Sequence, residues 1–185
     1  TYEEKLEVAD CLDALGVDVI EAGFPIASEG DFDAVSAIAK RVQNATVAGL
    51  ARAINADIDR AGEAVRHAKR GRIHTFVSTS PIHLEYQMRK SQAEVLEIIT
   101  ATVARARNLV DNVEWSAMDA TRTPIDYLCQ CVDAAIKAGA TTINLPDTVG
   151  YATPQEYYEM FKAVRERVPN ADKAIFSTHC HNDLG

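Results

Sequence analysis

Residues 124–148, PIDYLCQCVDAAIKAGATTINLPDT, contain the pattern that decides the fold. Apolar residues recur at helical spacing over 124–138, and the helix is expected to end at Gly139, a residue type that commonly terminates helices. Residues 142–145 are a short run with the composition of a strand, which Pro146 is expected to end. The stretch therefore predicts one helix followed by one strand, with polar side chains just beyond the strand.

The same alternation of one helix and one strand recurs along the chain. Amphipathic or capped segments predict helices over 2–15, 31–42, 56–69, 91–110, 124–138 and 154–168. Short β-rich runs predict strands over 17–21, 46–51, 72–78, 113–117, 142–145 and 174–179. The strands begin roughly every 27 to 40 residues, and strands joined through one helix are parallel.

The positions of the polar residues favour a closed barrel over a doubly wound sheet. They lie at the carboxyl ends of several strands, namely at Glu21, Arg52, Ser78 to Ser80, Ser116, Asp147, Thr148, His179 and His181. Chemistry spread over many strand ends is typical of the (β/α)8 (TIM) barrel, whereas no G-x-G-x-x-G turn of a dinucleotide fold occurs. We expect residues 1–185 to form one partial catalytic domain, an incomplete barrel of about six βα units without its first and last strands.

Composition excludes several classes of function. The formal net charge is −8 and no basic run interrupts it, so neither nucleic acid nor an anionic membrane surface is an expected partner. No apolar stretch approaches the length of a membrane span, and no signal peptide is recognisable at Thr1. The four cysteines form no Cys-x-x-Cys pair, a usage typical of a reducing cytoplasm.

The sequence 177–185, STHCHNDLG, holds the strongest chemical signal. Residues two apart on an extended segment face the same side, so His179 and His181 point together while Cys180 faces away. Two imidazoles form half of a divalent-metal site that oxygen ligands complete. A pair of structural or exposed histidines is the alternative.

Weaker signals come from three other strand ends. Asp147 and Thr148 follow a strand and are placed to hold substrate oxygens, or merely to stabilise the turn. Glu21 ends an apolar strand, where a carboxylate needs a function or a partner such as an arginine. His83 follows a strand in a predicted loop, where most histidines are simply exposed. His74 is expected only to form part of the barrel wall or surface.

Together these stretches resemble the α-isopropylmalate synthase and homocitrate synthase family of metal-dependent, pyruvate-carboxyltransferase-like barrels, and α-isopropylmalate synthases most of all. The motifs that carry the resemblance run through the whole chain: residues 16–25 (GVDVIEAGFP), 30–32 (GDF), 50–52 (LAR), 72–76 (RIHTF), 79–81 (TSP), 139–144 (GATTIN), 146–151 (PDTVGY) and 179–185 (HCHNDLG).

The resemblance implies a leucine-biosynthesis acyltransferase. It would condense acetyl-CoA with 3-methyl-2-oxobutanoate, giving 2-isopropylmalate and CoA. The implied metal ligands are His179 and His181, for Mn²⁺, Mg²⁺ or Zn²⁺. Substrate contacts are implied for His83, Ser116 and Thr148, with Thr148 and Glu21 as the catalytic residues. The family also implies a homodimer of the full-length protein.

Two departures from the family pattern bear on activity. Many members carry Glu where this sequence has Met118, and a thioether neither accepts a proton nor holds a cation as a carboxylate does. Substrate choice is therefore open at this position. The family's Leu-Arg-Asp-Gly motif, which supplies a metal-ligand aspartate, does not occur in the sequence, so the site is expected to be incomplete within it.

Other functions remain as alternatives. Homocitrate synthase, citramalate synthase and 3-hydroxy-3-methylglutaryl-CoA lyase share the histidine pair and differ in the substrate pocket. A non-catalytic barrel fragment is the alternative from another class, and the number of polar strand ends disfavours it. A metal-free aldolase needs a lysine at a strand end, but Lys137 falls in a helix and Lys173 before its strand.

Overall fold

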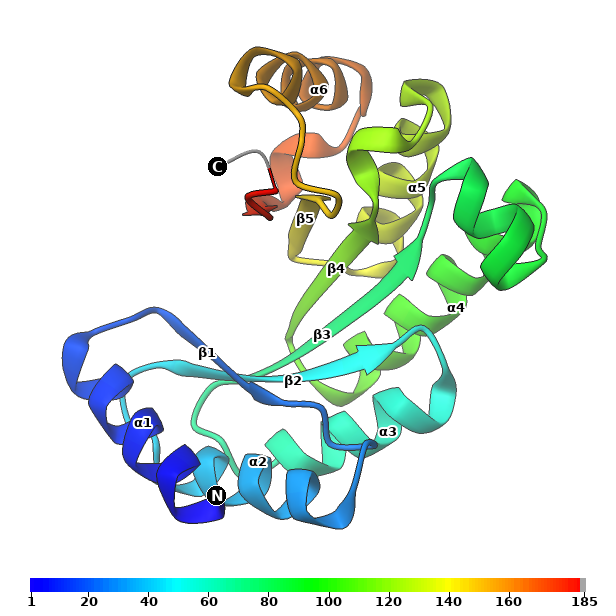
Figure 1. Cartoon of the computed structure of the whole chain (residues 1–185). Coiled ribbons are helices and arrows are strands. Elements are labelled where there is room, and N and C mark those ends of the chain that lie inside the picture. The colour runs from blue at the N-terminus through cyan, green and yellow to red at the C-terminus, as the bar shows by residue number, and fades with distance from the viewer. Residues whose placement is uncertain (184–185) are drawn as a thin grey trace. The chain divides into compact units, whose positions relative to one another are not determined.

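A computed structural model describes residues 1–183 and contains six strands that alternate with helices (Figure 1). The strands are β1 (Val19–Gly23), β2 (Thr46–Arg52), β3 (Gly71–Ser78), β4 (Asn112–Met118), β5 (Thr142–Asp147) and β6 (Ile175–Cys180). The helices are α1 (Tyr2–Leu15), α2 (Glu29–Arg41), α3 (Asn55–Val65), α4 (Gln92–Leu109), α5 (Ile125–Ala138) and α6 (Pro154–Arg167). All twelve elements predicted from the sequence are present, with boundaries that shift by a few residues.

The strands hydrogen-bond in chain order, β1-β2-β3-β4-β5-β6, in one sheet. The pairs β1/β2, β4/β5 and β5/β6 are parallel, as strands joined through a helix must be. Sequential parallel strands with one helix in each connection confirm the predicted α/β class and the repeating unit of an incomplete (β/α)8 barrel. No helix within residues 1–183 has both the length and the apolar character needed to cross a lipid bilayer.

The chain forms two compact units, the first made of Thr1–Thr75 and Arg105–Val113. Its core is a small apolar cluster to which α1, α2, β1 and β2 contribute: Ala9, Ile20, Ile38, Ala39, Val42, Ala45 and Val47. α1 begins at a capping box formed by Thr1 and Glu4 and ends at Gly16 in the left-handed conformation. Arg52, one of the polar strand-end residues, donates two side-chain hydrogen bonds to the buried carboxylate of Asp57, so it is used within this unit.

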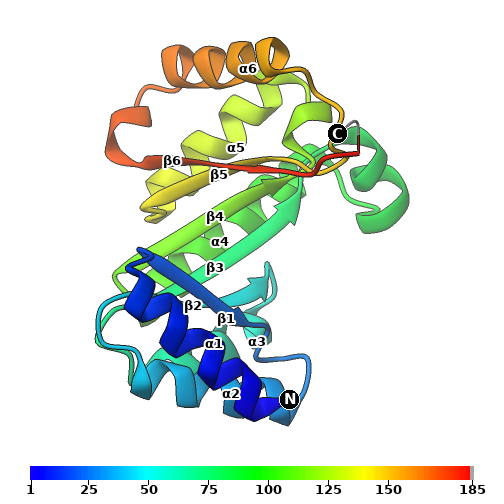
Figure 2. The same cartoon turned by 60° about the vertical axis from the view of Figure 1, so that its left-hand side comes forward.

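The second unit contains Phe76–Ala104 and the chain from Glu114 onward. Its helices α5 and α6 lie on one side of β5 and β6 (Figure 2). Fully buried side chains of this unit include Leu128 of α5, Trp115 of β4, and Ile143 and Leu145 of β5. The predicted site residues other than Glu21 all belong to this unit.

Two local predictions were wrong. β5 was expected to end before Pro146 but continues to Asp147, with Pro146 paired to His179 in register. Pairing of β5 to β4 extends only to Asn144, so beyond this residue β5 has a partner strand on one side only. The N–H that Pro146 lacks is tolerated at such a position. Residues 83–88, expected to be loop, form a one-turn π-helix that begins at His83.

α6 offers a test of the capping box that precedes the site-bearing strand β6. The Thr153 hydroxyl accepts from the Glu156 N–H, and the Glu156 carboxylate accepts from the Thr153 N–H. Thr153→Ala removes the cap and is expected to lower the free energy of unfolding by about 1 kcal/mol. The exposed neighbour substitution Gln155→Ala is the control, with an expected change below about 0.5 kcal/mol. Chemical denaturation of both variants measures the difference, and equal stabilities would show that the cap contributes nothing.

Candidate metal and substrate site

Strands β4 to β6 present one apolar and one polar face. Register pairs Ser116 with Asn144 and Asn144 with Ser177, so these three side chains form one row. The neighbouring positions Trp115 and Ile143 point to the opposite face and are fully buried. The polar row and these apolar side chains thus lie on opposite faces of the strands, and Ser116 and Asn144 of the row are themselves buried.

His179 and His181 continue the polar face at the end of β6. Their ring centroids lie 5.2 Å apart and the ring planes are inclined by 59°. Cys180 points to the other side, where its thiol interacts with the Tyr157 hydroxyl of α6. Burial raises the pKa of Tyr157 above its usual value and the hydrogen bond with Cys180 raises it further, so that hydroxyl stays protonated. The two imidazoles therefore lie side by side, as the alternation of an extended chain predicts.

The loop after β5 packs directly against the histidine pair. The His181 N–H donates to the Asp147 carbonyl oxygen at 3.2 Å. Gly150 has φ +69°, and a Cβ placed on it would lie 2.8 Å from both the carbonyl carbon and the Cβ of His181. Only glycine combines this backbone conformation with so close an approach. The turn from Asp147 to Gly150 thereby fixes the chain on which His181 is carried.

The two imidazoles fit a divalent cation as part of its ligand set. Both side chains are exposed, and neutral imidazole nitrogen is a common ligand of Zn²⁺ and of other divalent ions. Within residues 1–183 no group of three or more His, Cys, Asp or Glu side chains is arranged to hold a metal ion. The ligand role of the pair stays a prediction.

Asp147 is committed to the turn rather than to a ligand. Its buried carboxylate accepts from the Gly150 and Ala152 N–H groups at 3.2 and 3.0 Å, and from the Thr121 hydroxyl at 3.0 Å. A carboxylate that accepts three internal hydrogen bonds stabilises the loop in which it lies. Of the two polar residues at the end of β5, Thr148 is the one left to meet a substrate.

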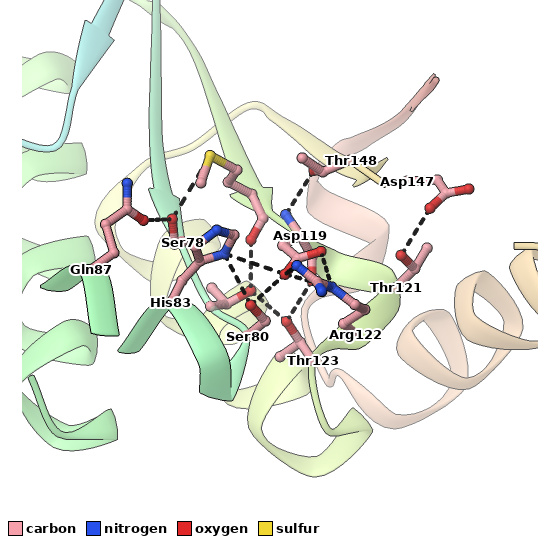
Figure 3. Close-up of polar contacts among 12 residues, drawn as sticks. Ser78, Ser80, His83, Gln87, Asp119, Thr121, Arg122, Thr123, Asp147 and Thr148 are labelled. Carbon is pink, nitrogen blue, oxygen red and sulfur yellow. Dashed lines mark hydrogen bonds and ion pairs between the residues drawn. The ribbon is translucent and has the colours of Figure 1, made fainter. Parts of the chain in front are cut away.

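Thr148 and His83 are brought together through Asp119, a residue that the sequence analysis did not single out (Figure 3). The Asp119 N–H donates to the Thr148 hydroxyl oxygen at 2.9 Å. The Asp119 carboxylate lies 3.3 Å from Nδ1 of His83 and also pairs with Arg122. The signal available in the sequence was a carboxylate directly after a strand, followed three residues later by an arginine.

Ser116 lies buried on the polar face and accepts a hydrogen bond from the Asn144 side-chain amide at 2.9 Å. Met118, two residues further along the same face, has its sulfur 3.8 Å from the Ser78 hydroxyl. A thioether at this position gives a substrate an uncharged, polarisable contact in place of a carboxylate. The substrate-binding role of Ser116 stays a prediction.

Glu21 lies in the first compact unit, and its surroundings differ from those expected. Its side chain is 46% exposed, so it is not a buried carboxylate. One partner of its carboxylate is the Nδ1 atom of His74 on β3. The pairing joins residues 53 positions apart, which no local pattern reveals. The catalytic role of Glu21 stays a prediction.

Curated relatives resemble the chain closely over its whole length. The 2-isopropylmalate synthase of Afipia carboxidovorans is 80% identical over 185 residues, and that of Nitrobacter winogradskyi is 78% identical. Both alignments cover 100% of this chain and 36% of the relative, so the chain spans about a third of the length of these relatives.

Solved structures show the same fold at low sequence identity. The HMG-CoA lyase of Bacillus subtilis superposes with a TM-score of 0.75 at 23% identity, covering 100% of this chain and 63% of that one. The hydroxymethylglutaryl-CoA lyase of Pseudomonas aeruginosa gives 0.77 at 20% identity with the same coverage. The family profile described as HMGL-like matches residues 1–185. The chain therefore belongs to the HMGL-like family.

Proposed function

We propose that the protein containing this chain is a 2-isopropylmalate synthase, an acyltransferase of leucine biosynthesis. It would condense acetyl-CoA with 3-methyl-2-oxobutanoate and release 2-isopropylmalate and CoA. The observation that carries the proposal is the identity of 78 to 80% with relatives of that name over all 185 residues. The likeness to lyase structures, at 20 to 23% identity, supports the fold alone.

In this proposal His179 and His181 hold a divalent cation, for which Mn²⁺, Mg²⁺ and Zn²⁺ are the candidates. Bound there, the cation supplies Lewis-acid polarisation of the substrate ketone. The 5.2 Å separation of the two rings and their shared face support a common ligand. Cys180 points away from the two histidines, so the metal ligands offered here are the imidazole nitrogens alone.

The remaining residues bind and orient the 2-oxo acid. The Thr148 oxygen already accepts from the Asp119 N–H, so the hydrogen of the hydroxyl is the part offered to a substrate oxygen. His83 and Ser116 are proposed as further contacts and Glu21 as a catalytic group. Met118 suits the branched hydrocarbon end of 3-methyl-2-oxobutanoate better than the charged end of a dicarboxylic acid.

The comparison of 2-oxo acids tests the substrate. CoA release by the full-length protein is measured with a thiol reagent for 3-methyl-2-oxobutanoate, pyruvate and 2-oxoglutarate. We expect kcat/KM for 3-methyl-2-oxobutanoate to exceed that for pyruvate by about tenfold or more, since each methyl group in an apolar pocket contributes that order of discrimination. Preference for 2-oxoglutarate would indicate a homocitrate synthase, and preference for pyruvate a citramalate synthase. Cleavage of 3-hydroxy-3-methylglutaryl-CoA would indicate a lyase.

The proposal extends to the setting of the protein. We propose a cytoplasmic homodimer that takes acetyl-CoA and a small 2-oxo acid as its partners, with neither nucleic acid nor membrane among them. The four free cysteines support the compartment, and the formal charge of −8 supports the exclusion of nucleic acid. The dimer is proposed from the family resemblance alone. The apparent mass of the full-length protein in solution tests the dimer.

A further inference from the structure

Asp119 is the point at which three strand-end loops meet (Figure 3). Its side chain is 0% exposed, and its backbone has φ +67°, a left-handed conformation that costs a non-glycine residue about 1 kcal/mol or more. Its N–H bonds to Thr148 after β5, and its carboxylate reaches Ser80 and His83 after β3. A buried aspartate with a left-handed backbone and contacts to two of the three predicted substrate-binding residues, His83 and Thr148, indicates a function beyond loop stability.

The hydrogen bonds around Asp119 fix where the hydrogens lie. Arg122 donates from Nε to Oδ1 at 2.8 Å and its Nη2 lies 2.6 Å from Oδ2, and this hydrogen bonding raises the pKa of the guanidinium above its usual value. Paired with the guanidinium, the buried carboxylate acts as a hydrogen-bond acceptor. The Ser80 hydroxyl donates to the same carboxylate, so its hydrogen is no longer available to His83.

The tautomer of His83 follows from this arrangement. Its Nδ1 lies 3.1 Å from the Ser80 oxygen and 3.3 Å from Oδ2 of Asp119. Both neighbours act as acceptors toward the ring, so Nδ1 has to carry the hydrogen. Nε2 has no hydrogen bond within residues 1–183, and the His83 side chain is 26% exposed. Nε2 is therefore the nitrogen that a ligand meets.

We propose that Asp119 is a positioning residue, whose carboxylate holds His83 with Nδ1 protonated and leaves Nε2 as the nitrogen for a ligand. The identity of the ligand as a 2-oxo acid rests on the proposed function, whereas the tautomer of His83 does not. Arg122 is the counter-ion of the Asp119 carboxylate.

The tautomer is measured directly by nitrogen NMR on the full-length protein labelled with ¹⁵N-histidine, with the His83→Gln spectrum identifying the His83 signals. We expect Nδ1 protonated in the wild type, and unchanged in Ser80→Ala because the carboxylate remains. In Asp119→Asn the side chain has one oxygen in place of two, so we expect His83 to lose its single tautomer with Nδ1 protonated. An unprotonated Nδ1 in the wild type, or an unaltered Nδ1–H signal in Asp119→Asn, overturns the proposal. This readout needs no turnover, so it stands even where the proposed reaction fails.

Kinetics separate positioning from a purely structural role. The Asn side chain leaves the backbone N–H to Thr148 in place, so the effect of Asp119→Asn arises from its side-chain contacts, among which is the one to His83. We expect KM for the 2-oxo acid to rise about tenfold. The double variant with His83→Gln should have the KM of His83→Gln alone, because the two residues act as one unit. If the increases in KM of the two single variants multiply in the double variant, the residues act independently and the proposal is contradicted. Asp59→Asn removes an exposed carboxylate bonded to Arg105 and is the matched control, expected to leave KM unchanged.

Discussion

Replacing His179 by alanine in the full-length protein is expected to abolish CoA release and to weaken divalent-metal binding by at least about a hundredfold. Loss of outer residues that only orient metal ligands already costs roughly 10- to 100-fold, and loss of a ligand costs more. Calorimetric titration with Zn²⁺ or Mn²⁺ and the CoA-release assay measure the two effects separately.

The adjacent residue supplies a matched control. Cys180 lies between the two histidines but points toward Tyr157 of α6, so Cys180→Ser keeps both imidazoles in place. Its metal affinity and turnover are expected to stay within about twofold of the wild type, since Cys180 is exposed and serine is of similar size. Turnover with bound metal in His179→Ala would contradict the ligand assignment. Equal losses in both variants would point to a general effect on β6 instead.

Gly150→Ala is expected to lower the free energy of unfolding by about 2–4 kcal/mol. The left-handed backbone at φ +69° accounts for about 1–2 kcal/mol of this, and overlap with His181 accounts for the rest. The overlap involves the main-chain carbonyl carbon of His181, which cannot rotate away as a side-chain end can. Metal affinity is expected to fall as well, because any shift that relieves the steric overlap moves the backbone of His181. Thermal or denaturant unfolding and metal titration measure both quantities.

Gly30→Ala is the control for that substitution. Gly30 lies in α2 and the nearest atom to an added Cβ is the Ser28 hydroxyl oxygen at 3.9 Å, an ordinary contact. Alanine is the better helix former, so a small gain of up to about 1 kcal/mol is expected. A Gly150→Ala protein as stable as the wild type would show that the turn after β5 is not held in the position described.

Local sequence patterns were sufficient to predict the repeating unit of one helix and one strand. They were also sufficient to predict that His179 and His181 lie on the same side of their strand. The helix stop at Gly139 and the spacing of His179 and His181 each depend on residues close together in the chain. Period and turn chemistry of this kind are readable without tertiary information. The prediction that Cys180 faces away from the histidines followed from the same alternation.

The contacts that the sequence did not predict join distant residues. Ser80 and Asp119 are 39 positions apart, and Glu21 and His74 are 53 apart. Nothing in either local stretch identifies such a partner, because folding alone brings the two strand ends together. The π-helix at His83 was missed for a different reason, since π turns are rare and have no reliable local signature.

The two faces of strands β4 to β6 differ in what they contribute, and this has an evolutionary consequence. Stability in the second unit comes from the helix-covered side, where Trp115 and Ile143 are fully enclosed. The opposite row of Ser116, Asn144 and Ser177 contains small polar side chains with little apolar area to lose. Ser116 and Asn144 are buried and hydrogen-bonded to each other, so only exchanges that keep this bond are expected to spare the melting temperature. Under the proposed function, a change of acid specificity through this row is therefore reachable by few substitutions, each of which replaces one hydrogen-bonding side chain by another.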